Sequence, residues 1–309
     1  MDGLIPVNKT AGYTSHDIVA VVRRMTNERA CGHTGTLDPG ASGVLVLCMG
    51  KATRLSRFLT DMPKSYEAEV VFGTATATGD SEGEVVSSLE HFSLEPGAVV
   101  EALQRFTGHI MQIPPMVSAV HYEGRRLYEL AREGVVVDRK AREVTIHRIE
   151  PIALNEWPDP IVFGSVIKID VACSKGTYIR TLCEDVCASL GVPGHMGALA
   201  RTEAAGFRID DAVTLEQIQH AGQCGEWERV LKPMELGITH LVQLRLNADE
   251  YRRIRCGNRL YVDVSRLSKE PCYTSWIALL NEDGGLAAIA EPIDVDAKEA
   301  LGLQPRVVF

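Results

Sequence analysis

A glycine-rich block near the start of the chain surrounds one carboxylate and one imidazole. Residues 32–45 read G-H-T-G-T-L-D-P-G-A-S-G-V-L, and their ionisable side chains are His33 and Asp38. Because glycine lets a loop bring its backbone close to a ligand, this loop can present the Asp38 carboxylate to one. The alternative interpretation is a tight turn in which Asp38 caps a backbone N–H. Asp38 is therefore the first candidate for a catalytic group.

A second block places a tyrosine and an arginine where a strand turns into a helix. Residues 173–182 read C-S-K-G-T-Y-I-R-T-L. The turn Ser174-Lys175-Gly176 precedes a helix expected over residues 178–190, so Tyr178 and Arg180 stand at the helix start and can point into a cleft. The alternative is a solvated arginine beside a half-buried tyrosine.

Motifs for phosphate and metal binding fail on their spacing. Lys51 follows a glycine, but a phosphate-binding loop needs another glycine at position 45, which is Leu. The calcium-like run at residues 80–83 has its glycine at loop position 4 instead of 6. Cys183 and Cys187, with His195 beyond them, lack a fourth partner for zinc, and the two cysteines are interpreted as a buried, inert pair. We therefore predict no metal and no cofactor.

The elements that position these groups can be predicted from hydrophobic periodicity. The apolar run Val44 to Met49 follows the first block and predicts a buried strand. Alternation over residues 66–72 predicts a strand with Tyr66 on its inward side. A capping box of Thr14 with Asp17 predicts a helix from about residue 15 to 26. The remaining predictions are helices near 96–107 and 126–133 and strands over 144–151 and 166–172.

The order of these elements favours a mixed α+β sheet over a regular βαβ winding. Three glycines and a proline interrupt residues 221–240. Beyond this stretch the pattern changes to short strand-like runs at 260–264, 275–280, 286–290 and 306–309. We predict two domains, one of residues 1–240 and a small β-rich domain of residues 241–309.

The composition is that of an ordinary globular chain of 309 residues, without an apolar run long enough to span a membrane and without a secretory signal pattern. We expect a cytoplasmic protein whose eight scattered cysteines are free thiols. The formal net charge of −9 argues against a protein that coats polyanions in general. Residues 1–60, however, carry seven Lys or Arg against four Asp or Glu, so positive charge is concentrated locally.

Together the two blocks resemble the TruB family of tRNA pseudouridine synthases, which make the pseudouridine at position 55 in the T loop of tRNA. The resemblance covers residue 3 to about residue 235. Further matches are Lys9, Ser15, Lys64-Ser65-Tyr66, Gly79-Asp80 with Gly83, Pro114-Pro115 through Ser118-Ala119, Gly124 to Arg132, Leu199 and Arg201-Thr202. The resemblance implies a catalytic domain with a mixed, largely antiparallel sheet flanked by helices, and a C-terminal domain similar to the PUA type.

The resemblance implies three catalytic residues. Asp38 would attack C1′ of the target uridine or remove the 2′ proton, and the sequence leaves both routes open. Arg180 would pair with this carboxylate, which a closed pocket would otherwise solvate poorly. Tyr66 would stack on the uracil and take up the C5 proton, and Tyr178 and Leu199 would line the same pocket.

The resemblance further implies contacts with a folded RNA loop. An enzyme that acts at C1′ and C5 of a stacked base must first extrude that base, and His33 would fill the vacancy. The alternative is a loop histidine that bonds its own turn. Phosphate contacts are expected from basic side chains that are otherwise solvated surface, namely Lys9, Lys64, Arg125, Arg126 and Arg142. The expected partner is the tRNA T stem-loop; we expect a monomer without a membrane or an obligate protein partner.

Three functional hypotheses follow. The first is a tRNA uridine isomerase that needs no cofactor, because the reaction involves no net hydrolysis or electron transfer. The second is a tRNA-folding chaperone whose catalytic residues are dispensable, and the sequence does not separate these two roles. The third is a glycosidase that uses Asp38 and releases free uracil. It ranks last because glycosidases generally use two carboxylates, and only one acidic group lies in the two blocks.

Overall fold

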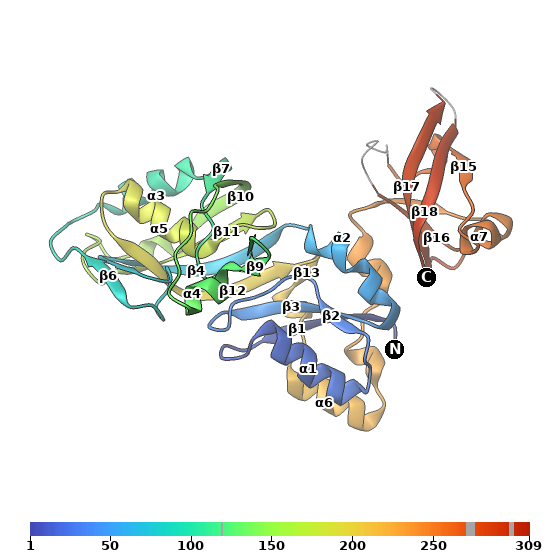
Figure 1. Ribbon diagram of the computed structural model, residues 1–309, viewed down its shortest axis with the longest axis horizontal. Helices are drawn as coiled ribbons and strands as arrows, with labels where there is room; N and C mark the ends of the chain where they lie inside the picture. Colours follow the sequence, from blue (N-terminus) through green and yellow to red (C-terminus); the bar gives the residue numbers. More distant parts are fainter. Residues whose placement is uncertain (119, 270–275, 297–299) are drawn as a thin grey trace.

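The computed structural model describes residues 1–118, 120–269, 276–296 and 300–309. Figure 1 shows a long body built on one sheet, followed by a smaller β-rich body at the C-terminal end. The strands of the larger sheet are β1 Gly3–Lys9, β2 Cys31–His33, β3 Ser42–Met49, β4 Lys64–Phe72, β7 Gly108–Gln112, β10 Arg142–Ile152, β11 Val166–Cys173, β12 Gly194–Ala204 and β13 Phe207–Arg208.

Within the described residues, the larger sheet follows the path β1-β3-β12-β4-β11-β10-β7, with β2 paired to β3 and β13 paired to β12. Neighbouring strands on this path are antiparallel except β3 and β12, which pair in parallel. The prediction of a mixed, largely antiparallel sheet is therefore confirmed. Two short hairpins lie outside this sheet, β5 Thr74–Thr76 with β6 Val85–Ser88 and β8 His121–Tyr122 with β9 Arg125–Arg126.

Four helices cover the larger sheet in two groups. The helices of the described residues are α1 Ser15–Thr26, α2 Ser56–Thr60, α3 Pro96–Arg105, α4 Leu127–Arg132, α5 Ile179–Ser189, α6 Leu215–Cys224 and α7 Ala248–Arg255. In Figure 1, α1 and α6 lie side by side next to β1 and β3. Helices α3 and α5 contact each other, and α3 packs on β10 whereas α5 packs on β12 and β4. The catalytic candidates fall between these two packed regions.

The alternation predicted for β4 is observed, with Tyr66, Ala68, Val70 and Phe72 all buried. These side chains share one core with Val171 and its alternate neighbours in β11 and with the apolar faces of α3 and α5. A fully buried valine, leucine or phenylalanine contributes about 1.5–3 kcal/mol relative to an exposed one. Burial of one face of β4 therefore fixes its register, and that register turns Tyr66 toward the interior.

Helices α1 and α5 begin and end within one residue of their predicted bounds, whereas α2, α6 and α7 were not predicted. Thr14 accepts a hydrogen bond from the Asp17 backbone N–H, and the Asp17 side chain bonds the Thr14 backbone in return, which completes the capping box of α1. Helix α5 starts at Ile179 with Tyr178 as its N-cap residue, and Gly191 follows its end with a φ of 75°. Left-handed backbone at that place is the usual way in which a helix stops.

Strand β12 lies at the centre of the sheet, yet no part of the sequence pattern predicted it. Its glycines at 194 and 197 and two register shifts against β4 interrupt the alternation that identifies a strand. Gly194 is required by a close approach, because a Cβ there would lie 2.2 Å from the Sγ atom of Cys187 in α5. The close packing of α5 on β12 therefore requires a glycine, and this glycine interrupts the alternation by which the strand could have been predicted.

The smaller body is a five-stranded sheet in the order β14-β16-β17-β18-β15 among the described residues. Its strands are β14 Val242–Arg245, β15 Leu260–Asp263, β16 Ile277–Leu280, β17 Leu286–Asp296 and β18 Ala300–Val308. The last two are longer than predicted, and Ser275, included in one predicted strand, is outside the described residues. This sheet has its own core with α7 and also packs on the larger body through residues such as Leu280 and Ile289.

The seven cysteines in the described part of the chain are free thiols, as predicted, and Cys272 lies outside that part. Each helix in the same part of the chain is too short or too polar to traverse a lipid bilayer.

In the parallel contact between β3 and β12, Gly43 should be the position at which an added side chain lowers the unfolding free energy most. Its φ is +104°, and a Cβ there would lie 2.2 Å from the carbonyl oxygen of Arg201. Gly12 has a similar φ of +92° but no neighbouring heavy atom within 4 Å, so it is a matched control. Gly12→Ala should cost about 1–2 kcal/mol of unfolding free energy from left-handed backbone alone. Gly43→Ala should cost clearly more in urea titrations, and equal losses would show that the close contact has no energetic weight.

Candidate active site

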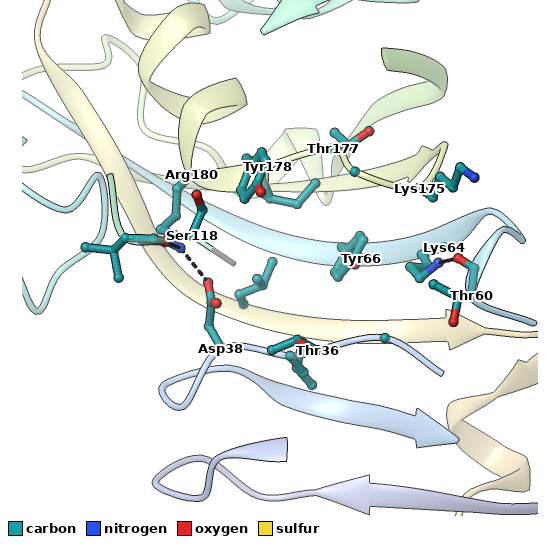
Figure 2. Close-up of a pocket in the computed structure, with 16 residues that line it drawn as sticks. Thr36, Asp38, Thr60, Lys64, Tyr66, Ser118, Lys175, Thr177, Tyr178 and Arg180 are labelled. Carbon is teal, nitrogen blue, oxygen red and sulfur yellow. Dashed lines mark hydrogen bonds and ion pairs between the residues drawn. The ribbon is translucent and has the colours of Figure 1, made fainter. Parts of the chain in front are cut away.

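A cavity of about 230 Å³ brings together five separate segments of the chain. The glycine-rich block contributes residues 35–38, β4 contributes Tyr66, and the second block contributes residues 175–180. Leu199 of β12 and the segment 117–118 close the remaining sides. Figure 2 shows the Asp38 and Arg180 side chains directed toward each other in this cavity. The two blocks identified in the sequence therefore meet in space.

An ion pair joins the two blocks. The Arg180 Nη2 atom lies 3.2 Å from the Asp38 Oδ2 atom. The arginine side chain is only 6% exposed, whereas that of Asp38 is 43% exposed. The cation is thus held inside the protein while the carboxylate remains open to the cavity. This arrangement allows a substrate atom to reach Asp38 without separating the pair.

Arg180 also connects two further segments. Its Nη1 atom donates to the Thr78 carbonyl oxygen at 3.1 Å, and its Nη2 atom donates to that of Val117 at 2.9 Å. A second carboxylate, Asp80, lies 3.5 Å from Nη1. In the sequence, Asp80 is identified only as part of a failed calcium motif and as a residue of the family pattern. Its contact with Arg180 could not be found from spacing, because 100 residues separate the two.

The aromatic and apolar candidates line the same cavity. Tyr66 and Leu199 are each 8% exposed, and Tyr178 is half-buried at the start of α5. Burial raises the pKa of the Tyr66 hydroxyl, and the neighbouring Arg201 partly opposes this rise. Gln112 fixes the backbone of Tyr178, because its side-chain amide accepts from the Tyr178 N–H at 3.0 Å and donates to the Tyr178 carbonyl at 3.3 Å.

Lys9 corrects one expectation, because it is fully buried and cannot serve as a surface phosphate contact. Its Nζ atom donates to the carbonyl oxygens of Thr10, Pro39 and Ala41 at 3.1, 3.1 and 2.6 Å. Two of these acceptors lie just after Asp38. The side chain runs inward from the end of β1 because β1 pairs with β3, which follows the glycine-rich block directly. Lys9 therefore positions the block.

Arg201 holds the same block from β12. In the sequence it is identified only as a residue that matches the family pattern. This arginine is 1% exposed and donates to the carbonyl oxygens of Val44, Thr36 and Gly35 at 2.7, 3.2 and 3.2 Å. Among the described residues it has no carboxylate partner within 4.0 Å. Its charge is balanced by backbone dipoles of the loop, so the loop and the cation stabilise each other.

His33 and Lys64 occupy different places relative to the cavity. His33 ends β2 outside the cavity lining, is half-buried, and packs edge-on against His16 with ring centroids 5.8 Å apart. Burial lowers the pKa of His33, and its Nδ1 atom accepts a hydrogen bond from the Gly35 backbone N–H at 3.3 Å, which is the bond within its own turn that the alternative interpretation expects. Lys64 does line the cavity, and its Nζ atom donates to the carbonyls of Thr60 and Met62. Burial lowers the pKa of Lys64 to about 8.

The chain is similar in fold to chains of two solved complexes. It aligns with a chain of the solved "Crystal Structure of a Cbf5-Nop10-Gar1 Complex" with a TM-score of 0.75 and 23% identity, covering 99% of this chain and 84% of that one. A chain of the "Structure of H/ACA RNP bound to a substrate RNA containing 2'-deoxyuridine" aligns with a TM-score of 0.74 and 22% identity, covering 99% and 84%. At this level of identity the likeness establishes the fold.

Sequence comparison defines the family. The N-terminal domain of the TruB family pseudouridylate synthases matches residues 23–179, and the tRNA pseudouridylate synthase B C-terminal domain matches residues 180–239. The chain is 40% identical to tRNA pseudouridine synthase B of Pelotomaculum thermopropionicum, with 100% of this chain and 97% of that protein covered. It is 42% identical to the protein of the same name from Streptococcus pneumoniae serotype 4 over the full length of both. The chain belongs to the TruB family.

Lys9 should make stability depend on pH in a defined window. Burial and the nearby Arg201 lower the pKa of Lys9 to about 8, against 10.5 for an ordinary lysine. Between these values the unfolded chain holds a proton that the folded protein has lost, so the unfolding free energy rises with pH. In urea unfolding, the unfolding free energy of wild type should therefore rise relative to that of Lys9→Met as pH increases from 8 to 10.5. The exposed Lys51→Met is the control, and a gap for Lys9→Met that stays constant with pH would contradict the assignment.

Proposed function

We propose that this protein converts uridine 55 in the T loop of tRNA to pseudouridine. The observation that carries the proposal is the Asp38–Arg180 ion pair, whose carboxylate faces a cavity that also contains Tyr66. Membership of the TruB family, with relatives named tRNA pseudouridine synthase B, supports tRNA as the substrate. The reaction breaks the bond from C1′ to N1, rotates the uracil in place and joins C1′ to C5.

Asp38 acts on the sugar in its ionised form. In one route the carboxylate bonds to C1′ as the C1′–N1 bond breaks and leaves when C5 attacks. In the other, it removes the 2′ proton to give a glycal. Arg180 serves either route, because its guanidinium lies 3.2 Å from the carboxylate and its four contacts prevent the side chain from turning away. The anion also stabilises positive charge that develops at C1′.

The uracil lies on Tyr66 while it rotates. The aromatic ring gives a flat apolar surface that does not bond the edges of the base, so rotation breaks no direct hydrogen bond to it. The Tyr66 hydroxyl is proposed to relay a proton, because its oxygen takes up the C5 proton as its own proton passes on to N1. One proton leaves C5 and one reaches N1, so the overall reaction is an isomerisation. Tyr178 and Leu199 limit the space above and beside the base.

His33 and Lys64 are proposed to contact the RNA outside the reacting base. His33 stands five residues before Asp38 and outside the cavity lining, which suits a planar ring that fills the vacancy left by the extruded uridine. Lys64 is placed at the cavity wall for a phosphate. We also propose that the protein acts as a cytoplasmic monomer, with residues 241–309 as a separate domain that contacts the tRNA.

A glycosidase that uses Asp38 is the competing function. Asp80 places a second carboxylate beside Arg180, so the number of acidic groups no longer argues against hydrolysis. Family membership favours isomerisation, and the product distinguishes the two, because hydrolysis gives free uracil whereas isomerisation gives none.

Asp38→Asn should abolish catalysis without abolishing RNA binding. Release of tritium from a T-arm hairpin labelled at C5 should fall about 10³-fold or more, since the neutral amide neither attacks C1′ nor accepts a proton. The dissociation constant for the hairpin should change by no more than about threefold, and Asp283→Asn in an exposed turn should behave as wild type. Free uracil, modification at another position, or full activity of Asp38→Asn would each contradict the proposal.

A further inference from the structure

A second imidazole lies beside His33, and the function proposed above gives it no task. His16 is the second residue of α1, and the centroid of its ring lies 5.8 Å from that of His33, with an angle of 76° between the ring planes. Aromatic rings prefer such an edge-to-face arrangement. His16 is exposed to solvent and His33 is half-buried. The pair of rings therefore extends from the glycine-rich block to the surface of the protein.

The start of α1 is bonded to the glycine-rich block next to the catalytic carboxylate. Ser15, directly before His16, is buried, and its hydroxyl accepts from the Leu37 N–H at 2.8 Å and donates to the Leu37 carbonyl oxygen at 3.1 Å. Leu37 directly precedes Asp38. The backbone that carries His16 is thus held in a fixed position relative to the block that carries His33.

The first turn of α1 is held by two further sets of bonds. The Gly12 N–H donates to the Pro39 carbonyl oxygen at 2.9 Å, which fixes the segment that leads into the helix. The capping box uses the Asp17 carboxylate twice, since its Oδ2 atom accepts from the Thr14 N–H at 2.9 Å and from the Thr14 hydroxyl at 2.6 Å. Among the described residues the His16 ring makes no hydrogen bond and no ion pair. It packs against His33 without a polar partner of its own.

The His33 ring depends on such a neighbour because its own hydrogen bond is long. Its Nδ1 atom accepts from the Gly35 N–H at 3.3 Å, beyond the usual range for an N–H donor. A ring that fills a vacancy in an RNA stack must enter it in one orientation, and a side chain that becomes ordered only on binding lowers the affinity. A ring that is already held in that orientation avoids this loss.

The surrounding structure argues against two other tasks for His16. It is absent from the lining of the catalytic cavity, so it does not touch the reacting base. It is also exposed, whereas Ile18, Val19 and Val22 supply the buried apolar face of α1, so the core does not depend on it. The contact with the His33 ring is the task that the geometry leaves.

We propose that His16 is a positioning residue for the extrusion of the target uridine. It holds the His33 ring in the orientation in which that ring enters the vacancy, and it acts through His33. The inference rests on the proposed function, since the vacancy exists only when a uridine has been extruded into the catalytic cavity. It gives α1, which contributes no residue to the lining of that cavity, a part in binding the RNA.

A double-mutant cycle tests whether His16 acts through His33. The reference protein, His16→Ala, His33→Ala and the double variant all carry Asp38→Asn, so that binding is measured without turnover. The probe is a fluorescein-labelled T-arm hairpin, titrated by anisotropy. His16→Ala should weaken binding about three- to tenfold, as expected for the loss of one aromatic contact. In the His33→Ala background the same change should alter Kd by less than about twofold.

The type of side chain at position 16 separates ring packing from other effects. His16→Phe keeps a planar ring and should bind within about twofold of the reference protein, whereas His16→Leu should bind as weakly as His16→Ala. His91→Ala, in an exposed loop before α3, is the matched control and should bind as the reference protein does. The urea midpoint should be the same for the His16 variants as for the reference protein, because the residue is exposed.

Three results would overturn the role of His16. They are reference-like binding by His16→Ala, effects of His16→Ala and His33→Ala that multiply in the double variant, and weak binding by His16→Phe. If the wild-type protein releases no tritium from a T-arm hairpin labelled at C5, the proposed function fails instead. Turnover by wild type together with any of the three results refutes the role of His16 alone.

Discussion

The ion pair between Arg180 and Asp38 is the contact on which the rest of the site depends. A guanidinium that is almost fully buried must satisfy its donors inside the protein, and Arg180 does so with Thr78, Val117, Asp38 and Asp80. These partners come from separate parts of the chain. The same cation that pairs with the Asp38 carboxylate therefore also joins the walls of the cavity, so loss of Arg180 would affect both charge and architecture.

Two other buried cations fix the loop that presents Asp38. Lys9 holds the carbonyls after the aspartate, and Arg201 holds those before it and at the start of β3. Neither donates to the Asp38 carboxylate, so each acts on position and on the local field. Three buried cations, Lys9, Arg180 and Arg201, are therefore gathered around the loop of one carboxylate in a chain whose formal net charge is −9.

Local patterns predicted the elements that carry the site, and long-range contacts decided what those patterns left open. The alternation of β4 was sufficient to turn Tyr66 inward, and the turn before α5 was sufficient to place Tyr178 and Arg180 at a helix start. The role of Lys9 could not be inferred, because lysine is normally exposed and its acceptors are backbone atoms on another strand. Arg201 was equally hidden, since it lies on β12, where glycines and register shifts conceal the strand.

A crystal structure of Asp38→Asn bound to a T-arm hairpin tests the central claim most directly. The account predicts that the target uridine is extruded, that its base lies on Tyr66, and that the side chain at position 38 stands about 3–3.5 Å from C1′ or from the 2′ oxygen. Arg180 should keep its backbone partners in that complex. A uridine that remains stacked in the hairpin, or one whose sugar lies away from residue 38, would contradict the account.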